Sequence, residues 1–483
     1  MTAGDGDADG AGGARPGYEL GFQSVETEHD GEPLPVEGAM PEWLSGSLVR
    51  NGPGLFEAGG ETVEHWFDGL AMLRKFAIAD GAVRYSNRFL RTEEYETVTR
   101  EGAMAAGQFG SAPDASPVER LVRTVRPPVT DNANVHVHPV GDEYVAVTET
   151  TRAVRFDPAT LTTLGSFAFD DDVPGQWRCA HSVRDPVAGE TLNLLVAFGR
   201  QTRYVLTRRP DGSRQREVLA EIPVDEPAYT HSFAATPNYV VVTEPPFRVS
   251  PLDLVLPWRG SGSFVDNYDW RPADGTRFLV VDRSSGEVVA RPRAGPAFVY
   301  HHVNAVERDD AVLVDLVAFD GPAAVGDLSL SALRAGEGGG PRGQLRRYRL
   351  PLSGGAAGCR RLHRGLTLPR CDERRRTRQY RHAYGQHRPA GAAFATGLAS
   401  VDVETGRAAT WESDLYVGEP VFVPRPGGEA DDDGVLLAVG LDTEARRSAL
   451  VVVDADSMRE LARAPAPHVV PFDFHGRFLD GVQ

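Results

Sequence analysis

The chain contains the same short unit three times: a histidine, a turn-rich connection and an apolar strand. The histidines are His181, His231 and His301, and the strands that follow them are residues 192–196, 239–242 and 311–314. A fourth histidine, His475, follows a last apolar run close to the C-terminus. Repetition of one β unit predicts similar units packed side by side. Histidines at equivalent places in such units can converge on one axis, where neutral imidazoles bind a metal.

Turn signals recur between short β-branched runs from about Pro33 to the C-terminus, and few segments show helical periodicity. Four turns place an aspartate directly after a strand, where its side chain can cap the turn: Asp157, Asp282, Asp402 and Asp454. We therefore predict an all-β fold. Radial repetition leaves only short sheet edges exposed, so the pattern favours the blades of a β-propeller. A β-sandwich with several insertions is the alternative.

The composition is acidic and unusually poor in lysine. The formal net charge of the 483 residues is -17, and Lys75 is the only lysine. Acidity of this size argues against a nucleic-acid partner, whose phosphates would be repelled. The preference for arginine fits a GC-rich genome, and the excess of Asp and Glu is typical of halophilic proteins, which stay soluble in high salt.

Cysteine content and terminal sequence predict the compartment and the domain limits. Cys179, Cys359 and Cys371 lack the spacing of a zinc site and are too few for a disulfide scaffold, which favours a reducing compartment. We predict a disordered acidic tail and lead-in at residues 1–33 and one domain at 34–483. No apolar run approaches the roughly 20 residues that span a bilayer. The expected location is the cytoplasm, where the protein can also associate peripherally with the inner face of the cell membrane.

Two segments depart from the β pattern. In the first, Ser116 can cap a helix that has Pro117 at its first position and Glu119 in a capping box. Its apolar face can lie on a membrane or pack on the protein's own core, and both interpretations stay open. The second, residues 252–258, is apolar and can join the same surface or line the entrance of a pocket.

Other histidines compete with the repeated ones on local pattern alone. His136 and His138 form a His-x-His pair, and a turn and an apolar strand also follow His138. His302 adjoins His301, and only one of two adjacent strand residues can easily point at the axis. By contrast, His65 is expected to pack near a turn, and the remaining histidines fit surface or packing positions.

Metal-bound histidines normally donate their second ring N–H to a carboxylate or a carbonyl. Glu149 and Glu419 lie beside apolar strands and are candidates for this role.

Seven motifs make the chain resemble the carotenoid cleavage oxygenase family, which includes the isomerohydrolase of the retinal pigment epithelium. They are RNGPG (50–54), HWFDG (65–69), TDNANV (130–135), TET (148–150), YHHVNA (300–305), GEPVFV (418–423) and FHG (474–476). The resemblance implies a seven-bladed β-propeller with a small helical and loop cap over its top face. It also implies an Fe(II) ion on the axis, held by His181, His231, His301 and His475. Glu149 and Glu419 match the family's histidine-orienting glutamates, whereas His136, His138 and His302 match no ligand.

The chain departs from the family pattern in one motif. The family often has a third glutamate in a Leu-Glu-x-Pro segment, and the matching stretch here is Leu366-Thr367-Leu368-Pro369. A histidine held by a hydroxyl or water instead is less firmly oriented, which predicts a weaker site unless Asp372 or Glu373 substitutes. The residue after the first ligand also differs, because Ser182 stands where the family often has proline.

By resemblance, the predicted activity is a non-haem Fe(II) dioxygenase that uses O2 to cleave a conjugated C=C bond of a carotenoid or apocarotenoid into aldehyde or ketone products. An apolar tunnel would select the double bond by shape, and apolar surface segments would admit a membrane-dissolved polyene. Two alternatives remain. One is stilbene-type cleavage or polyene isomerisation on the same iron site. The other, motivated by Thr367, is a propeller that binds a carotenoid without turnover.

Overall fold

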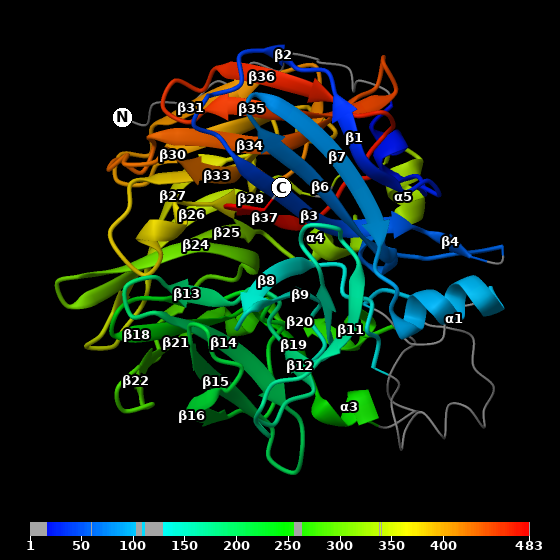
Figure 1. Cartoon of the computed structure of the whole chain (residues 1–483). Helices are drawn as coiled ribbons and strands as arrows, with labels where there is room; N and C mark the ends of the chain where they lie inside the picture. The colour runs from blue at the N-terminus through cyan, green and yellow to red at the C-terminus, as the bar shows by residue number, and fades with distance from the viewer. Residues whose placement is uncertain are drawn as a thin grey trace.

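Seven antiparallel sheets are arranged around one axis as the blades of a β-propeller (Figure 1). The computed structural model describes residues 17–58, 60–102, 109–111, 129–255, 263–337, 339 and 341–482. Innermost strands such as β37, β8, β24 and β28 lie near the centre of Figure 1, and outer strands such as β16 and β22 lie at the rim. The architecture confirms the predicted propeller and excludes the sandwich.

The first three blades follow one another in the first half of the chain. Blade 1 contains β1 (His29–Leu34), β7 (Ala82–Phe89), β6 (Leu70–Ala79), β3 (Gly46–Leu55) and β37 (His475–Leu479). Blade 2 contains β11 (Thr163–Phe167), β10 (Ala153–Phe156), β9 (Glu143–Val147) and β8 (His136–Val140). Blade 3 contains β16 (Glu217–Pro223), β15 (Arg203–Pro210) and β14 (Glu190–Ala197), with an inner edge divided between β12 (Trp177–Arg178) and β13 (Val183–Asp185).

The other four blades complete the ring. Blade 4 contains β22 (Val288–Ala290), β23 (Arg293–Ala294), β21 (Thr276–Asp282), β18 (Tyr239–Glu244) and β17 (Ala234–Ala235). Blade 5 contains β27 (Gly358–Arg364), β26 (Gln344–Pro351), β25 (Ala311–Phe319) and β24 (Phe298–Arg308). Blade 6 contains β31 (Ala408–Glu412), β30 (Gly397–Asp402), β29 (His382–His387) and β28 (Leu366–Arg370). Blade 7 contains β2 (Glu37–Gly38), β36 (Glu460–Pro465), β35 (Arg447–Asp454) and β34 (Gly434–Asp442), with β32 (Tyr416–Val417) and β33 (Val421–Pro424) inside.

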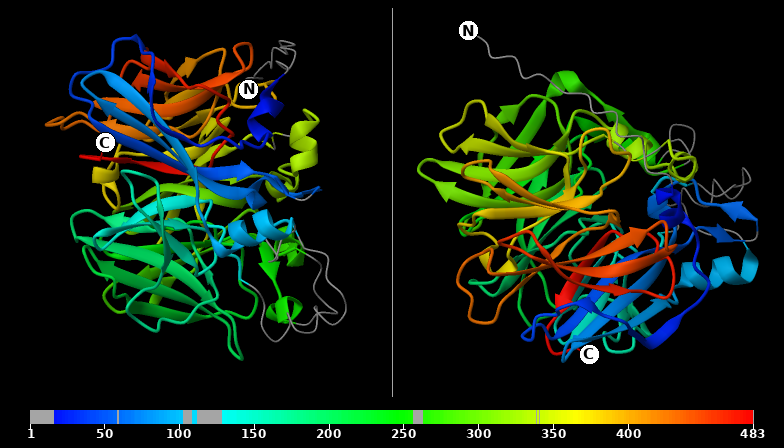
Figure 2. Two further views of the ribbon diagram at one scale, coloured as in Figure 1. Left: turned by 45° about the vertical axis from the view of Figure 1, so that its right-hand side comes forward. Right: turned by 90° about the horizontal axis from the view of Figure 1, so that it is seen from above.

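Short helices and two extra hairpins lie outside the seven blade sheets. Helices α1, α3 and α5 are on the right in Figure 1 and in the left panel of Figure 2. The helices are α1 (Glu93–Glu101), α3 (Pro251–Val255), α4 (Ala323–Gly326), α5 (Leu330–Arg334) and the 3-10 turns η1 (Tyr18–Phe22), η2 (Trp66–Asp68), η3 (Val265–Asn267), η4 (Pro272–Asp274) and η5 (Glu373–Arg375). The hairpins are β4 (Glu57–Ala58) with β5 (Glu61–Thr62), and β19 (Phe247–Val249) with β20 (Tyr268–Trp270). No helix in the described ranges is long and apolar enough to cross a membrane.

The repeated sequence unit corresponds to the inner hairpin of a blade. The apolar runs that follow the three histidines form β14, β18 and β25, which are the second strands of blades 3, 4 and 5. Each histidine lies at or beside the innermost strand, which faces the axis. The predicted turn caps are also confirmed, because the side chains of Asp157, Asp282, Asp402 and Asp454 each accept a hydrogen bond from a backbone N–H two or three residues later.

Hydrophobic faces of neighbouring blades pack against one another to form the core. Between blades 1 and 7, for example, Leu48 and Phe76 share one buried cluster with Leu437 and Leu450. Because each sheet covers the faces of its neighbours, the ring must close to bury both faces of every blade. Two pairings close the ring: β37 pairs with β3, so that both ends of the chain contribute to blade 1 (Figure 2), and β2 pairs with β36 in blade 7.

Part of the predicted N-terminal tail is folded. From Gly17 on, the lead-in forms η1 and the edge strand β1, which pairs with β7. Phe22 is fully buried against the rings of Trp66, Phe394 and Phe472. The prediction of disorder up to residue 33 is therefore wrong for residues 17–33, because aromatic burial and strand pairing outweigh their acidic composition. Residues 1–16 lie outside the described part of the chain.

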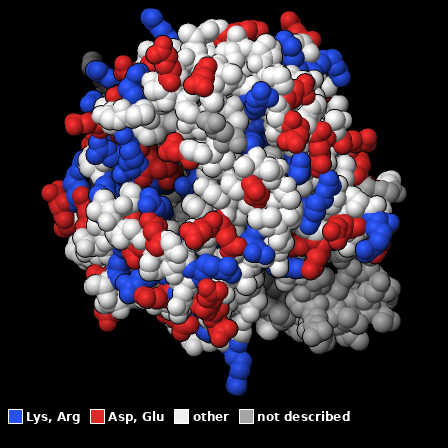
Figure 3. Space-filling view, viewed as in Figure 1, with Lys and Arg blue, Asp and Glu red and all other residues white. Residues whose placement is uncertain are grey.

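The two segments that broke the β pattern are described only in part. The predicted helix at 116–126 lies outside the described residues, and residues 256–258 of the second segment do as well. The start of that second segment forms α3, whose Leu252 is 52% exposed. On the face shown in Figure 3, acidic and basic side chains are interspersed over the described surface.

Replacing Phe22 by alanine tests whether the lead-in belongs to the folded domain. Loss of this buried ring is expected to lower the free energy of unfolding by about 3–5 kcal/mol, measured by urea denaturation. Leu164→Ala on β11 is the matched control, because Leu164 is 52% exposed and its loss should change stability by less than about 0.5 kcal/mol. Equal, small effects of the two substitutions would show that the lead-in is not packed on the propeller.

Candidate metal centre

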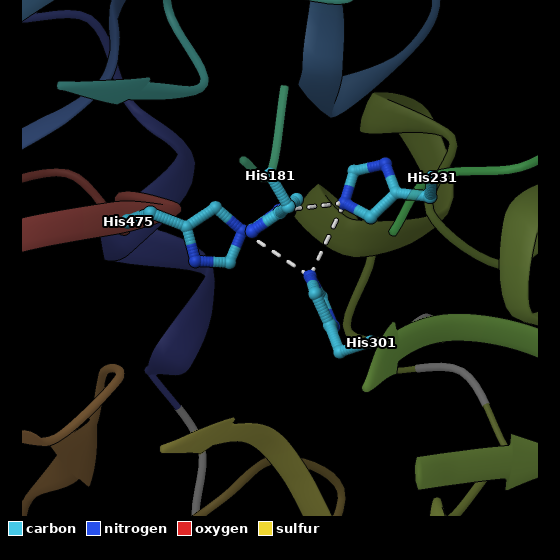
Figure 4. A group of neighbouring side chains, drawn as sticks. All are labelled: His181, His231, His301 and His475. Carbon is cyan, nitrogen blue, oxygen red and sulfur yellow. Dashed lines mark hydrogen bonds between the residues drawn. The ribbon is translucent and has the colours of Figure 1, made fainter. Parts of the chain in front are cut away.

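Four histidines converge on the propeller axis (Figure 4). Their Nε2 atoms are 3.1 Å apart between His181 and His231, 3.2 Å between His231 and His301, and 3.2 Å between His301 and His475. All four candidate ligand atoms lie within 4.8 Å of one another. They come from blades 3, 4, 5 and 1, so residues up to 294 positions apart in the sequence meet at one point.

Local backbone features aim these side chains at the axis. His181 lies between β12 and β13, where the inner edge of blade 3 is interrupted, and His231 lies just before β17. In β24 the register with β25 shifts between Val299 and His302. Such a bulge places two residues opposite one and re-aims a side chain. The bulge directs His301 to the axis, while His302 points the other way and contacts the hydroxyls of Ser232 and Thr243.

Histidines of the cluster have lowered pKa values, which suits metal binding. Burial, reinforced by neighbouring imidazoles, holds the pKa of His181 and of His301 well below the ordinary histidine value. Burial also lowers the pKa of His475 to about 4, although Glu419 opposes the shift. Neutral imidazoles present unprotonated nitrogens as ligands.

Carboxylates determine which nitrogen carries the proton on two of the rings. The Nδ1–H of His231 donates to Glu149 Oε1 at 2.5 Å, and the Nδ1–H of His475 donates to Glu419 Oε1 at 2.7 Å. Their Nε2 lone pairs therefore face the cluster centre. Each of these nitrogens lies 3.2 Å from His301 Nε2, and metal–nitrogen bonds of about 2.1 Å at right angles would place two nitrogens about 3.0 Å apart. The four residues fit a metal site.

The two glutamates have different surroundings. Glu149 also accepts a hydrogen bond from the Tyr229 hydroxyl, 3.0 Å away. Glu419 is 1% exposed and forms salt bridges with Arg50 and Arg370. These arginines hold the pKa of Glu419 well below its usual range, against the opposing effect of burial. His231 therefore shares the Glu149 carboxylate with one hydroxyl group, whereas His475 shares the Glu419 carboxylate with two guanidinium groups.

No carboxylate of the described residues lies within 4 Å of a ring nitrogen of His181 or His301. The Thr367 hydroxyl donates to Gln386 Oε1 at 2.9 Å, so it does not bond a cluster histidine. Asp372 and Glu373 do not substitute either. Asp372 pairs with Arg374, and Glu373 pairs with Arg376, so the suggestion that one of them replaces the missing glutamate is wrong.

The rival histidines take structural roles near the cluster. His136 Nδ1 accepts the backbone N–H of Val137, and His138 Nε2 contacts Ala180 O at 2.8 Å. His65 caps η2 by accepting the Phe67 N–H, and its Nε2–H donates to Val325 O. His138 does lie on an innermost strand, as its local pattern indicated, but its ring is hydrogen-bonded to blade 3 and lies outside the cluster.

An aromatic cavity of about 450 Å³ borders the cluster, with His231, His301 and His475 in its lining. The aromatic residues of its lining are Trp66, Phe67, Phe109, Trp177, Phe198, Tyr229, Phe264, Tyr300, Phe319, Phe394 and Phe474. Asp68 also borders it and accepts hydrogen bonds from Gly110 and Ser111; burial raises the Asp68 pKa to about 7. The cavity has the size and lining of a site for an extended apolar molecule.

Comparison with known proteins identifies the family. A model of the family described as retinal pigment epithelial membrane protein matches residues 22–480. The chain belongs to this family. It is 33% identical to carotenoid isomerooxygenase of Galleria mellonella, covering 93% of this chain and 94% of that protein. It is 30% identical to human beta,beta-carotene 15,15'-dioxygenase, covering 92% and 91%.

Solved structures of the family have the same fold. Cobalt-substituted apocarotenoid oxygenase of Synechocystis superposes with a TM-score of 0.83 at 27% identity, covering 96% of this chain and 98% of that one. The resemblance inferred from the seven motifs is thereby confirmed, and membership together with the four-histidine group supports a metal site on the axis.

Glu149→Gln is expected to weaken metal binding about 10- to 100-fold, because the neutral amide no longer polarises His231. Thr367→Val should leave metal affinity unchanged, since the Thr367 hydroxyl bonds Gln386 and no histidine. Competition of each variant with a chelator for Fe(II), under anaerobic conditions, gives the comparison. A larger loss in Thr367→Val than in Glu149→Gln would contradict these assignments.

Proposed function

We propose that this protein is an Fe(II) dioxygenase that cleaves a conjugated C=C bond of a carotenoid or apocarotenoid. The observation that carries the proposal is the cluster of four histidine Nε2 atoms, three of whose histidines line an aromatic cavity. His181, His231, His301 and His475 would hold the iron, and Glu149 and Glu419 would orient two of them. The names of the relatives, which are carotenoid oxygenases and dioxygenases, support the same reaction class.

Iron, when bound, supplies the redox chemistry that activates dioxygen. The reaction breaks one C=C bond, and each carbon gains one oxygen atom of O2, so two carbonyl products form without an external reductant. Four neutral histidines carry no charge to offset the metal, which favours Fe(II) with positions left for oxygen ligands.

The residues of the chain contribute alignment. The ring of Phe67 makes edge contacts with Tyr300 at 6.1 Å and with Phe474 at 5.1 Å, and these rings form part of the cavity wall. A polyene held against such walls can present one double bond to the centre, which converts a bimolecular encounter into a positioned reaction. The two carboxyl groups on the cavity wall have partners, Asp68 with Ser111 and Glu149 with His231, and the reaction needs no proton from them.

Val129, on the cavity lining, is 37% exposed, and Leu252 on α3 is 52% exposed. We place the entrance of the polyene near Val129 and α3, where these apolar side chains can contact a membrane surface. The cytoplasmic location stays a prediction.

Product masses test the reaction. Iron-loaded protein incubated aerobically with β-carotene or an apocarotenal should yield two carbonyl products whose masses sum to that of the substrate plus one O2. His231→Ala should lose bound iron and product, while His363→Gln, a change on the outer strand β27, should retain both. Cleavage of stilbenes alone, geometric isomers without cleavage, or substrate binding without turnover would each contradict the proposal. So would full iron and full activity in His231→Ala.

A further inference from the structure

A second, polar cavity lies beside the four histidines. His301 and His475 border both cavities, whereas His181 borders only the polar one and His231 only the aromatic one. The polar cavity has a volume of about 40 Å³. That space holds a small ion with about one or two water molecules, and no extended organic molecule.

Three arginines line this cavity. Arg370 donates to both oxygens of Glu419 and to Gly476 O at 2.8 Å. Arg376 donates to Glu373 and to Val303 O. Both guanidinium groups are therefore paired within the wall of the cavity.

The third arginine, Arg477, is half-buried and has no hydrogen-bonded partner, although the Glu373 carboxylate is near enough to favour its charge. Its side chain forms no hydrogen bond and no salt bridge with the described residues, and its Nε is buried without a hydrogen-bond partner. An unpartnered guanidinium at a cavity wall costs free energy unless water or an anion satisfies it. It offers five N–H donors in a planar fork, which suits an anion.

The balance of charge around the cavity is positive. Arg370, Arg376 and Arg477 face two lining carboxylates, Glu373 and Glu419, while Arg50, which shares Glu419 from outside the lining, is balanced by Asp473. A metal dication at the histidines would add to the excess. Because these charges lie close together in a region of low dielectric constant, an anion between them would relieve their repulsion.

The neutral residues of the lining also offer donors. His136 Nδ1 accepts the Val137 N–H, so the neutral ring of His136 carries its proton on Nε2. One lining residue reaches the protein surface, because the Glu373 side chain is 42% exposed.

We propose that this axial cavity binds one small monovalent anion of chloride size, held by Arg477 together with Arg376 and Arg370. The small volume excludes larger organic anions, and the unpartnered guanidinium and positive charge balance select an anion over water alone. The anion would lie against the guanidinium groups, on the side of the histidines away from the aromatic cavity, and would not bond the metal. Its binding would stabilise the folded protein.

Crystals of the iron-loaded protein grown with sodium bromide test the site directly. Anomalous diffraction at the bromine edge should show one bromide in the axial cavity, in contact with the Arg477 guanidinium. Density without an anomalous signal, a bromide bonded to the metal, or bromide at surface sites alone would overturn the proposal. The measurement reads no product, so its outcome is independent of the proposed reaction.

Thermal unfolding of the iron-loaded full chain gives a second test in solution. Potassium bromide, compared with potassium gluconate at equal ionic strength, should raise Tm saturably in the wild type, because gluconate is too large for the cavity. Arg477→Met should lose this shift. Arg364→Met, which removes an exposed guanidinium on β27, should keep it. An equal shift in all three proteins would overturn the proposal, and if Arg477→Met does not fold, Arg477→Lys should show a shift that needs more bromide to saturate.

Discussion

Closure of the propeller ring by β37 is the interaction on which the rest of the structure depends. This strand pairs with β3 so that His475 lies opposite Asn51. Without that pairing, blade 1 would lack its innermost strand, and the fourth histidine would be absent from the axis. Stability of the fold and assembly of the metal centre are therefore linked through one antiparallel register.

A network of buried ion pairs stabilises this closure. Arg50, on β3, pairs with Asp473 just before β37 and with Glu419 on blade 7, and all three residues are at most 5% exposed. Glu419 in turn accepts the Nδ1–H of His475. Removing one member would leave an uncompensated buried charge, which is strongly destabilising. The same network connects ring closure to the orientation of a histidine that we propose as a metal ligand.

Much of this arrangement could be predicted from the sequence. The repeated unit identified His181, His231 and His301, because equivalent positions in successive blades face the same axis. Local pattern did not distinguish His138 from them, since His138 also lies on an innermost strand. His301 was separated from His302 only by family resemblance, because the deciding feature is a backbone bulge in β24 that has no clear sequence signal.

The long-range partners of the site were missed for a similar reason. Arg370 reaches Glu419 through a bulge in β28 at which Leu368 has a φ of 45°, a conformation that leucine rarely adopts. Pairing between residues that are 49 positions apart leaves no local pattern. The folded lead-in was missed because its acidic composition suggested disorder, while the few aromatic residues in it determine where it packs.

The position of iron tests the central claim most directly. Anomalous diffraction at the iron edge, on crystals of the Fe(II)-loaded protein, should show one ion bonded to the Nε2 atoms of His181, His231, His301 and His475. Glu149 and Glu419 should remain on Nδ1 of their histidines, away from the metal. Iron bonded to a glutamate, bonded to fewer than four of these histidines, or located elsewhere would contradict the account.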